Sequence, residues 1–171
     1  MSGAAAMEME GDELSPARLA EANIHPDTRL ATDYLNHFNE VVMLIDMLPS
    51  MPDCAPDVMA WEPRSYTEHF RLSHFKGRDL AIRAYGTVAP DRRAAFEHTI
   101  RETDKALALV QSLIVEAPLD GLPYEALADV TEMRVKPLLA HAMGLINGAP
   151  PIVIQADESA DTQSAIDALF T

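Results

Sequence analysis

The feature that most constrains the fold of this chain is an apolar stripe in the segment 90–116. Its members are Phe96, Ile100, Thr103, Leu107, Val110 and Ile114. The spacing between them alternates between four and three residues, which places all of them on one face of an α-helix. A helix with one apolar face has to bury that face against other elements. The stripe therefore predicts a helical bundle.

Two other long segments show the same periodicity. The segment 30–48 ends at Pro49, because proline cannot continue a helix. Its apolar members are Tyr34, Phe38, Val41, Ile45 and Leu48. The segment 124–146 contains Pro137, which we expect to kink the helix or divide it in two. Its apolar members are Leu127, Val130, Val135, Leu138, Ala142 and Leu145.

Shorter helices are expected between the long ones, at residues 56–61, 65–73 and 78–85. The second of these opens with Ser-Tyr-Thr-Glu at 65–68, the pattern of a capping box. Apart from the short run 152–154, no segment alternates apolar and polar residues as a half-buried strand does. We therefore predict an all-α protein, a single helical bundle with a disordered N-terminus and a short amphipathic C-terminal peptide.

The chain is expected to consist of a body with two acidic ends. A disordered acidic N-terminus, a helical bundle, a linker and a partner-binding peptide are predicted at 1–27, 28–148, 149–160 and 161–171. A short helix at 16–22 is the only element expected within the first of these. The formal net charge is -14, of which -5 falls on residues 1–27 and -4 on residues 157–171. This charge repels phosphate backbones and anionic lipids, so we expect neither nucleic acid nor membrane as a partner.

A single cysteine, Cys54, excludes an internal disulfide and favours a reducing compartment. The N-terminal residues lack the basic and apolar regions of a secretory signal, and no apolar run is long enough to cross a bilayer. We therefore expect a cytoplasmic protein without a cofactor. A homodimer formed through an exposed stripe remains open.

The segment 33–36, Asp-Tyr-Leu-Asn, supplies the candidate catalytic residues Asp33 and Asn36. An acid and an amide three positions apart lie on one helix face. The pair resembles the acid-x-x-Asn pattern of the CheC and CheX phosphatases, which implies hydrolysis of a phosphoryl-aspartate with the amide orienting the attacking water. A second interpretation of the same helix is a metal site formed by Asp33, His37 and Glu40. An exposed polar strip is the simpler interpretation, and no metal is expected.

The C-terminal segment 162–170, Thr-Gln-Ser-Ala-Ile-Asp-Ala-Leu-Phe, is the strongest indication of function. It resembles the receiver-binding peptide of the flagellar switch protein FliM, and more loosely the C-terminal peptide of the phosphatase CheZ. The resemblance implies a role in chemotaxis, flagellar motility or two-component signalling, with a CheY-like receiver as partner. It also implies that Ile166, Leu169 and Phe170 enter an apolar groove and that Asp167 meets basic residues. The positions that match the FliM pattern are Gln163, Ile166, Asp167, Ala168 and Leu169, and Thr162 and Phe170 are mild replacements.

Other interpretations of this peptide stay open. Gln163, Ile166, Leu169 and Phe170 also fit the layout of peptides that bind a sliding clamp, which would make the chain a clamp-binding or scaffold protein. The peptide could instead fold back on its own bundle. A helix this short is marginal in water by itself, so each alternative supplies a surface against which it folds.

Overall fold

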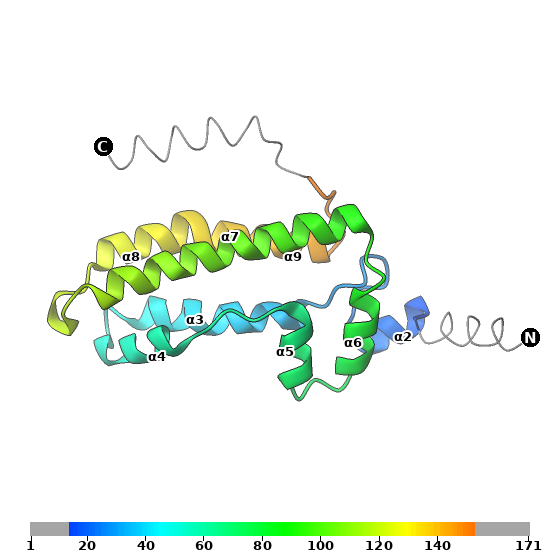
Figure 1. Cartoon of the computed structure of the whole chain (residues 1–171), viewed down its shortest axis with the longest axis horizontal. Helices are drawn as coiled ribbons and strands as arrows, with labels where there is room; N and C mark the ends of the chain where they lie inside the picture. Colours follow the sequence, from blue (N-terminus) through cyan, green and yellow to red (C-terminus); the bar gives the residue numbers. More distant parts are fainter. Residues whose placement is uncertain (1–13, 153–171) are drawn as a thin grey trace, which may run out of the picture.

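The computed structural model describes residues 14–152 of the chain, and all of its regular elements are helical (Figure 1). The predicted fold class is confirmed, since no strand occurs in the described range. In chain order the elements are α2 (Pro16–Glu21), η1 (Thr32–Leu35), α3 (Asn36–Met47), η2 (Pro52–Cys54), α4 (Ala55–Ala60), α5 (Tyr66–Leu72), α6 (Arg78–Tyr85), α7 (Pro90–Val115), η3 (Leu119–Gly121), α8 (Tyr124–Val130), η4 (Thr131–Val135) and α9 (Lys136–Ile146).

Helix α7 is the longest element and the centre of the packing. It begins at Pro90, a favoured first helical residue because an N–H there would have no partner within the helix. Helices α8 and α9 run beside α7 in one layer of Figure 1, and α3 and α4 lie in the other. Every member of the predicted stripe of α7 is buried, with at most 8% of any residue exposed. The stripe thus forms the middle of the core.

The segment expected as a helix at 30–48 begins as a short 3₁₀ turn, η1, which leads into α3. Its five predicted apolar members are all buried. The helix starts later than expected because Ala31 is extended, with ψ at 134°. This late start places Asp33 and Tyr34 on the 3₁₀ turn, where they lie at the edge of two depressions described below.

The segment 124–146 is divided, as Pro137 predicted, but the division also changes which residues are buried. A π-helical turn, η4, joins α8 to α9 just before the proline. A π turn accommodates one more residue than an α turn. Consequently Leu139 is buried where we expected Leu138, and Thr131 is buried where we expected Val130. The other four predicted members, Leu127, Val135, Ala142 and Leu145, are buried as expected, so the helical period was wrong only at these two positions.

Two serines cap helices, and one of the capped helices lies upstream of the expected body. Ser65 accepts a hydrogen bond from the backbone N–H of Glu68 at 3.1 Å, as the capping-box pattern predicted. Ser15 caps α2 in the same way. Leu19 on α2 and Ile24 after it are buried in the core. The packed body therefore extends N-terminal to residue 28, where we placed its start.

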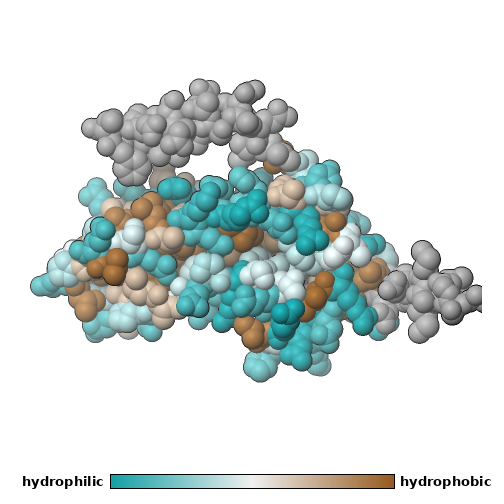
Figure 2. Space-filling model, in the orientation of Figure 1, coloured by the Kyte–Doolittle hydropathy of each residue, from teal (hydrophilic) through white to brown (hydrophobic). Residues whose placement is uncertain are grey.

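The surface of the described residues is mostly polar. Figure 2 shows hydrophilic side chains over most of one face, with apolar ones scattered between them. None of the helices in the range 14–152 is long and apolar enough to cross a membrane. The peptide 161–171 and most of the linker lie outside the described residues, as do residues 1–13.

The contact between α2 and α6 provides a test of the packing. A Cβ added to Gly77, at the start of α6, would lie only 2.8 Å from the Cβ of Ala22. We expect Gly77→Ala to lower the free energy of unfolding by about 1 to 3 kcal/mol, measured by urea denaturation. Gly144→Ala is the matched control, because Gly144 lies within α9 and its Cβ would meet that of Ala149, beyond the end of the helix, at an ordinary 3.6 Å. It should raise stability by about 0.5 to 1 kcal/mol. Equal stability of the two variants would contradict the close α2–α6 packing.

Candidate functional site

The structure brings the two predicted catalytic residues together and adds a third. Asp33 lies on η1, Asn36 is the first residue of α3, and His69 lies on α5. The Asn36 side-chain amide donates to Asp33 Oδ1 at 3.2 Å, and the other Asp33 oxygen lies 3.0 Å from His69 Nε2. The Asp33 carboxylate thus bridges an exposed amide and a mostly buried imidazole. The three form what we call the Asp33 cluster.

The Asp33 cluster opens onto a polar depression of about 350 Å³. Asn39, on the next turn of α3, lines the same depression, and Phe75 and Met143 form its apolar part. The Asn36 side chain uses one N–H for Asp33, which leaves its oxygen and its second N–H for another molecule. Asn36 is therefore the group that the cluster presents outward, and Asp33 holds it in place.

His69 serves this arrangement by fixing the carboxylate. Its ring packs edge-on against Tyr34 at 5.5 Å and against Phe70 at 5.0 Å, and it is 11% exposed. With Nε2–H donated to Asp33, the Nδ1 atom is left buried without a hydrogen-bond partner in the described part of the chain. No hydroxyl or thiol within residues 14–152 bonds to this histidine. The geometry is that of a positioned acid and amide, and not of a nucleophile with its base.

The alternative of a metal site at Asp33, His37 and Glu40 is not assembled by the fold. His37 is buried instead of forming part of an exposed polar strip, so that interpretation was wrong at this residue. Its Nε2 lies 2.6 Å from the carbonyl oxygen of Glu62, and its ring stacks on Trp61. Burial lowers the pKa of His37, so the neutral ring donates to that carbonyl. Within residues 14–152, no three His, Cys, Asp or Glu side chains lie close enough to hold a metal ion.

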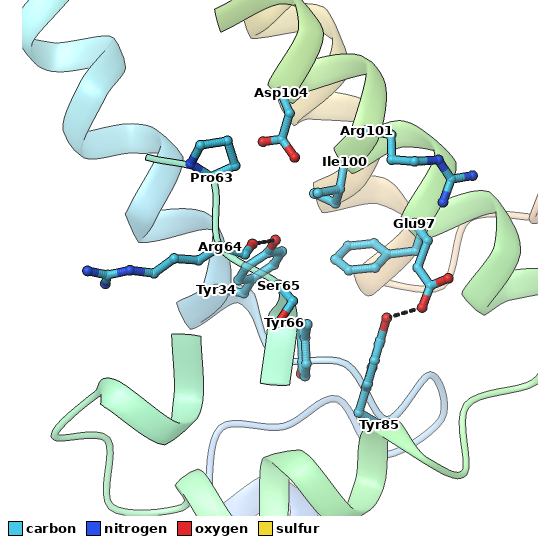
Figure 3. Close-up of a pocket in the computed structure, with 11 residues that line it drawn as sticks. Tyr34, Pro63, Arg64, Ser65, Tyr66, Tyr85, Glu97, Ile100, Arg101 and Asp104 are labelled. Carbon is cyan, nitrogen blue, oxygen red and sulfur yellow. Dashed lines mark hydrogen bonds between the residues drawn. The ribbon is translucent and has the colours of Figure 1, made fainter. Parts of the chain in front are cut away.

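A second space lies between η1, the start of α5, α6 and α7 (Figure 3). Its volume is about 310 Å³, and we call it the tyrosine cavity. Ring and aliphatic side chains form most of its wall, namely Tyr34, Tyr66, Tyr85, Phe96 and Ile100. The tyrosines are largely buried, which raises the pKa of each phenol above its ordinary value. All three therefore stay protonated in the physiological range.

The hydroxyl groups of these tyrosines already have partners in the protein. The Tyr34 hydroxyl donates to the carbonyl oxygen of Arg64 at 2.5 Å. The Tyr66 hydroxyl accepts from the backbone N–H of Ala31 at 2.8 Å, and the Tyr85 hydroxyl donates to Glu97 at 2.6 Å. The cavity consequently offers ring surfaces to a ligand more than it offers phenolic oxygens.

Two acids of α7 line the tyrosine cavity, and they differ in their environments. Glu97 accepts hydrogen bonds from Tyr85 and, at 3.1 Å, from Arg93. These bonds lower the pKa of the Glu97 carboxyl. Asp104 has no such partner: its Oδ1 atom is buried and unpaired within the described residues. Burial raises the pKa of Asp104 to about 6, because the low-dielectric surroundings disfavour its charge.

Reasoning from the sequence did not select His69 or Asp104. His69 lies 36 positions from Asp33 on a different helix, so only the tertiary fold makes them neighbours. Asp104 directly follows the buried Thr103 on α7, and an acid beside an apolar stripe was the one available signal. The predicted partner-binding residues Gln163, Ile166, Asp167, Leu169 and Phe170 lie outside the described residues.

The environment of Asp104 predicts a stability change with pH. Its pKa is raised from 3.8 to about 6 in the folded chain, so the folded state binds the proton more tightly, and stability falls as pH rises through this interval. Asp104→Asn removes that loss. It should be more stable than the wild type by about 1 to 3 kcal/mol above pH 6, and nearly equal to it near pH 4. The exposed Asp129→Asn on α8 is the control. The free energy of unfolding of all three proteins should be measured by denaturation at several pH values. The same pH dependence in all three would contradict a raised pKa of Asp104.

Comparisons with known proteins assign this chain to no family. No protein-family model, curated protein or solved structure matches it. The remaining indications of function are the residues of this chain and the resemblance of its C-terminal segment.

Proposed function

We propose that this chain is a cytoplasmic protein of chemotaxis or two-component signalling that binds a CheY-like receiver domain through residues 161–171. One observation carries the proposal. Gln163, Ile166, Asp167, Ala168 and Leu169 stand at the spacing of the FliM receiver-binding peptide. Ile166, Leu169 and Phe170 would then fill an apolar groove of the receiver, because on a helix they lie on one side of a single turn.

The expected strength of this contact suits reversible signalling. Burying three apolar side chains contributes about 4 to 9 kcal/mol. Ordering the peptide subtracts about 2 to 5 kcal/mol, so its affinity is micromolar at best. The acids Asp157, Glu158, Asp161 and Asp167 add attraction to a basic receiver surface. This attraction is screened by salt, so binding should weaken as ionic strength rises.

The Asp33 cluster supports a second role, the dephosphorylation of the bound receiver. Hydrolysis of a phosphoryl-aspartate requires a water molecule placed in line with the breaking bond, and an amide can orient it. The exposed Asn36 amide keeps an oxygen and an N–H for such a water, and the hydrogen bond from Asn36 to Asp33 limits its rotation. In this role Asn36 contacts the water, while Asp33 positions Asn36.

Receiver binding can be tested with the full chain and single substitutions in the peptide. Leu169→Ala and Phe170→Ala should each weaken binding to a CheY-like receiver by about 10- to 100-fold in isothermal titration calorimetry, since each removes one buried apolar group. Ser164→Ala is the matched control, because position 164 is variable in the FliM pattern. A receiver carrying a beryllofluoride phosphoryl mimic should be compared with the unmodified one.

Three outcomes would contradict receiver binding by this peptide. Binding that survives deletion of 161–171 would assign it to another part of the chain. A sliding clamp that binds the peptide where receivers do not would favour the clamp interpretation. A deletion variant that loses much of its unfolding free energy would indicate that the peptide packs on its own bundle.

Dephosphorylation is tested separately from binding. Asn36→Ala should slow the chain-stimulated loss of phosphate from the receiver at least about tenfold, because the water loses its orienting amide. The affinity for the receiver should be unchanged. Asn39→Ala is the matched control, since Asn39 lines the same depression without bonding to Asp33. Equal rates for wild type and Asn36→Ala would remove the catalytic role and leave the binding proposal intact.

A further inference from the structure

We propose that the tyrosine cavity is a binding site for a small organic cation, a primary ammonium group on an apolar body. The inference concerns residues of α7, η1 and the start of α5, and it does not depend on the proposed receiver binding. Three properties of the cavity favour such a ligand. They are the unpaired carboxylate of Asp104, the aromatic side chains in the wall, and the outward direction of the nearby guanidinium groups.

The unpaired acid is Asp104. Figure 3 shows its carboxylate directed from α7 toward the space between Pro63, Ile100 and Tyr34. The Oδ1 atom is buried and has no hydrogen-bond donor among the described residues. A buried acceptor without a donor is unfavourable, and a charged one more so. An ammonium group supplies both the missing donor and the opposite charge.

The ring wall favours a cation over a neutral polar ligand. Tyr34 sits 5.2 Å from Tyr66 and 6.1 Å from Phe96, measured between ring centroids. Aromatic rings attract cations, and the Arg93 guanidinium already lies 4.5 Å from the centroid of the Tyr85 ring on one side of the cavity. The phenolic oxygens are already bonded within the protein, so a ligand rich in hydroxyl groups would find few partners. A single charge on an apolar body matches this surface.

The positive side chains near the cavity do not neutralise Asp104. Arg64 and Arg101 line the rim, both are exposed, and in Figure 3 both guanidinium groups point away from the space. Glu97, the other acid, is paired with Arg93. The interior of the cavity therefore carries one uncompensated negative charge. The net charge of -14 on the whole chain also favours the approach of cations.

The size of the cavity limits the ligand to a small molecule. A volume of about 310 Å³ lies at the lower end of the range for ligand pockets. A ring or a short branched chain with one amine fits this space. Benzylamine is therefore a suitable probe, with benzyl alcohol and benzoate as its neutral and anionic counterparts of nearly equal size.

The experiment measures binding of these three probes to the purified full-length protein by saturation-transfer NMR and by thermal shift. Benzylamine should bind and raise the melting temperature, and benzyl alcohol and benzoate should not. Asp104→Asn should weaken benzylamine binding at least about tenfold, whereas Asp129→Asn should leave it unchanged. The melting temperature of each variant without ligand shows whether that variant is folded. The comparison of the three probes on the wild-type protein tests the proposal without any substitution.

The pH dependence gives an independent readout. The titratable and charged groups that line the cavity with Asp104 are Glu97 and Arg101 on α7, Arg64 before α5, and Tyr34, Tyr66 and Tyr85. Because the pKa of Asp104 is about 6 and the amine stays charged, benzylamine affinity should rise severalfold between about pH 5 and pH 7.5.

The inference is overturned by any of four results. These are no benzylamine binding at about 10 mM, equal binding of benzyl alcohol, unchanged binding by Asp104→Asn, or affinity that falls as pH rises. The last result would indicate a ligand that accepts a hydrogen bond from a protonated Asp104. None of these results bears on the receiver-binding proposal, which is tested with variants of a different segment.

Discussion

The buried ring of Tyr34 is the contact on which the rest of the structure depends. It is 1% exposed and meets Phe38, Tyr66 and Phe96, which come from α3, α5 and α7. Edge-to-face aromatic packing of this kind adds to the free energy gained from burial alone. The hydroxyl also donates to the Arg64 carbonyl, which ties the segment before α5 to η1. One side chain therefore holds three helices and a connecting segment in register.

Tyr34 also relates the two candidate sites to each other. Asp33, its neighbour on η1, lines the polar depression, while Tyr34 itself lines the tyrosine cavity. Two adjacent residues of the short 3₁₀ turn thus belong to two different sites, one polar and one aromatic. The His69 ring contacts both residues, since it packs edge-on against Tyr34 and its Nε2 lies 3.0 Å from Asp33 Oδ2.

The sequence alone was sufficient for the helices whose period is regular. The stripes of α3 and α7 are buried as predicted, because a period of 3.6 residues determines the inward face. It was insufficient at η4, where the register changes by one residue. It also identified Asp33 and Asn36, since their spacing is local, but not His69 or Asp104. The environments of those two residues depend on which helices pack together, and the adjacent residues in the sequence do not specify this packing.

The π turn at 131–135 also bears on how the chain could tolerate changes in length. It holds one residue more than an α-helix needs, next to a proline that already interrupts the hydrogen-bond ladder. Deleting one residue there would let α8 and α9 join as a continuous helix. Because the π turn accommodates the extra residue, the helix after such a deletion would keep its orientation, and Leu139 and Ala142 would stay buried. The turn is thus a point where the chain could lose one residue without changing the orientation of a whole helix.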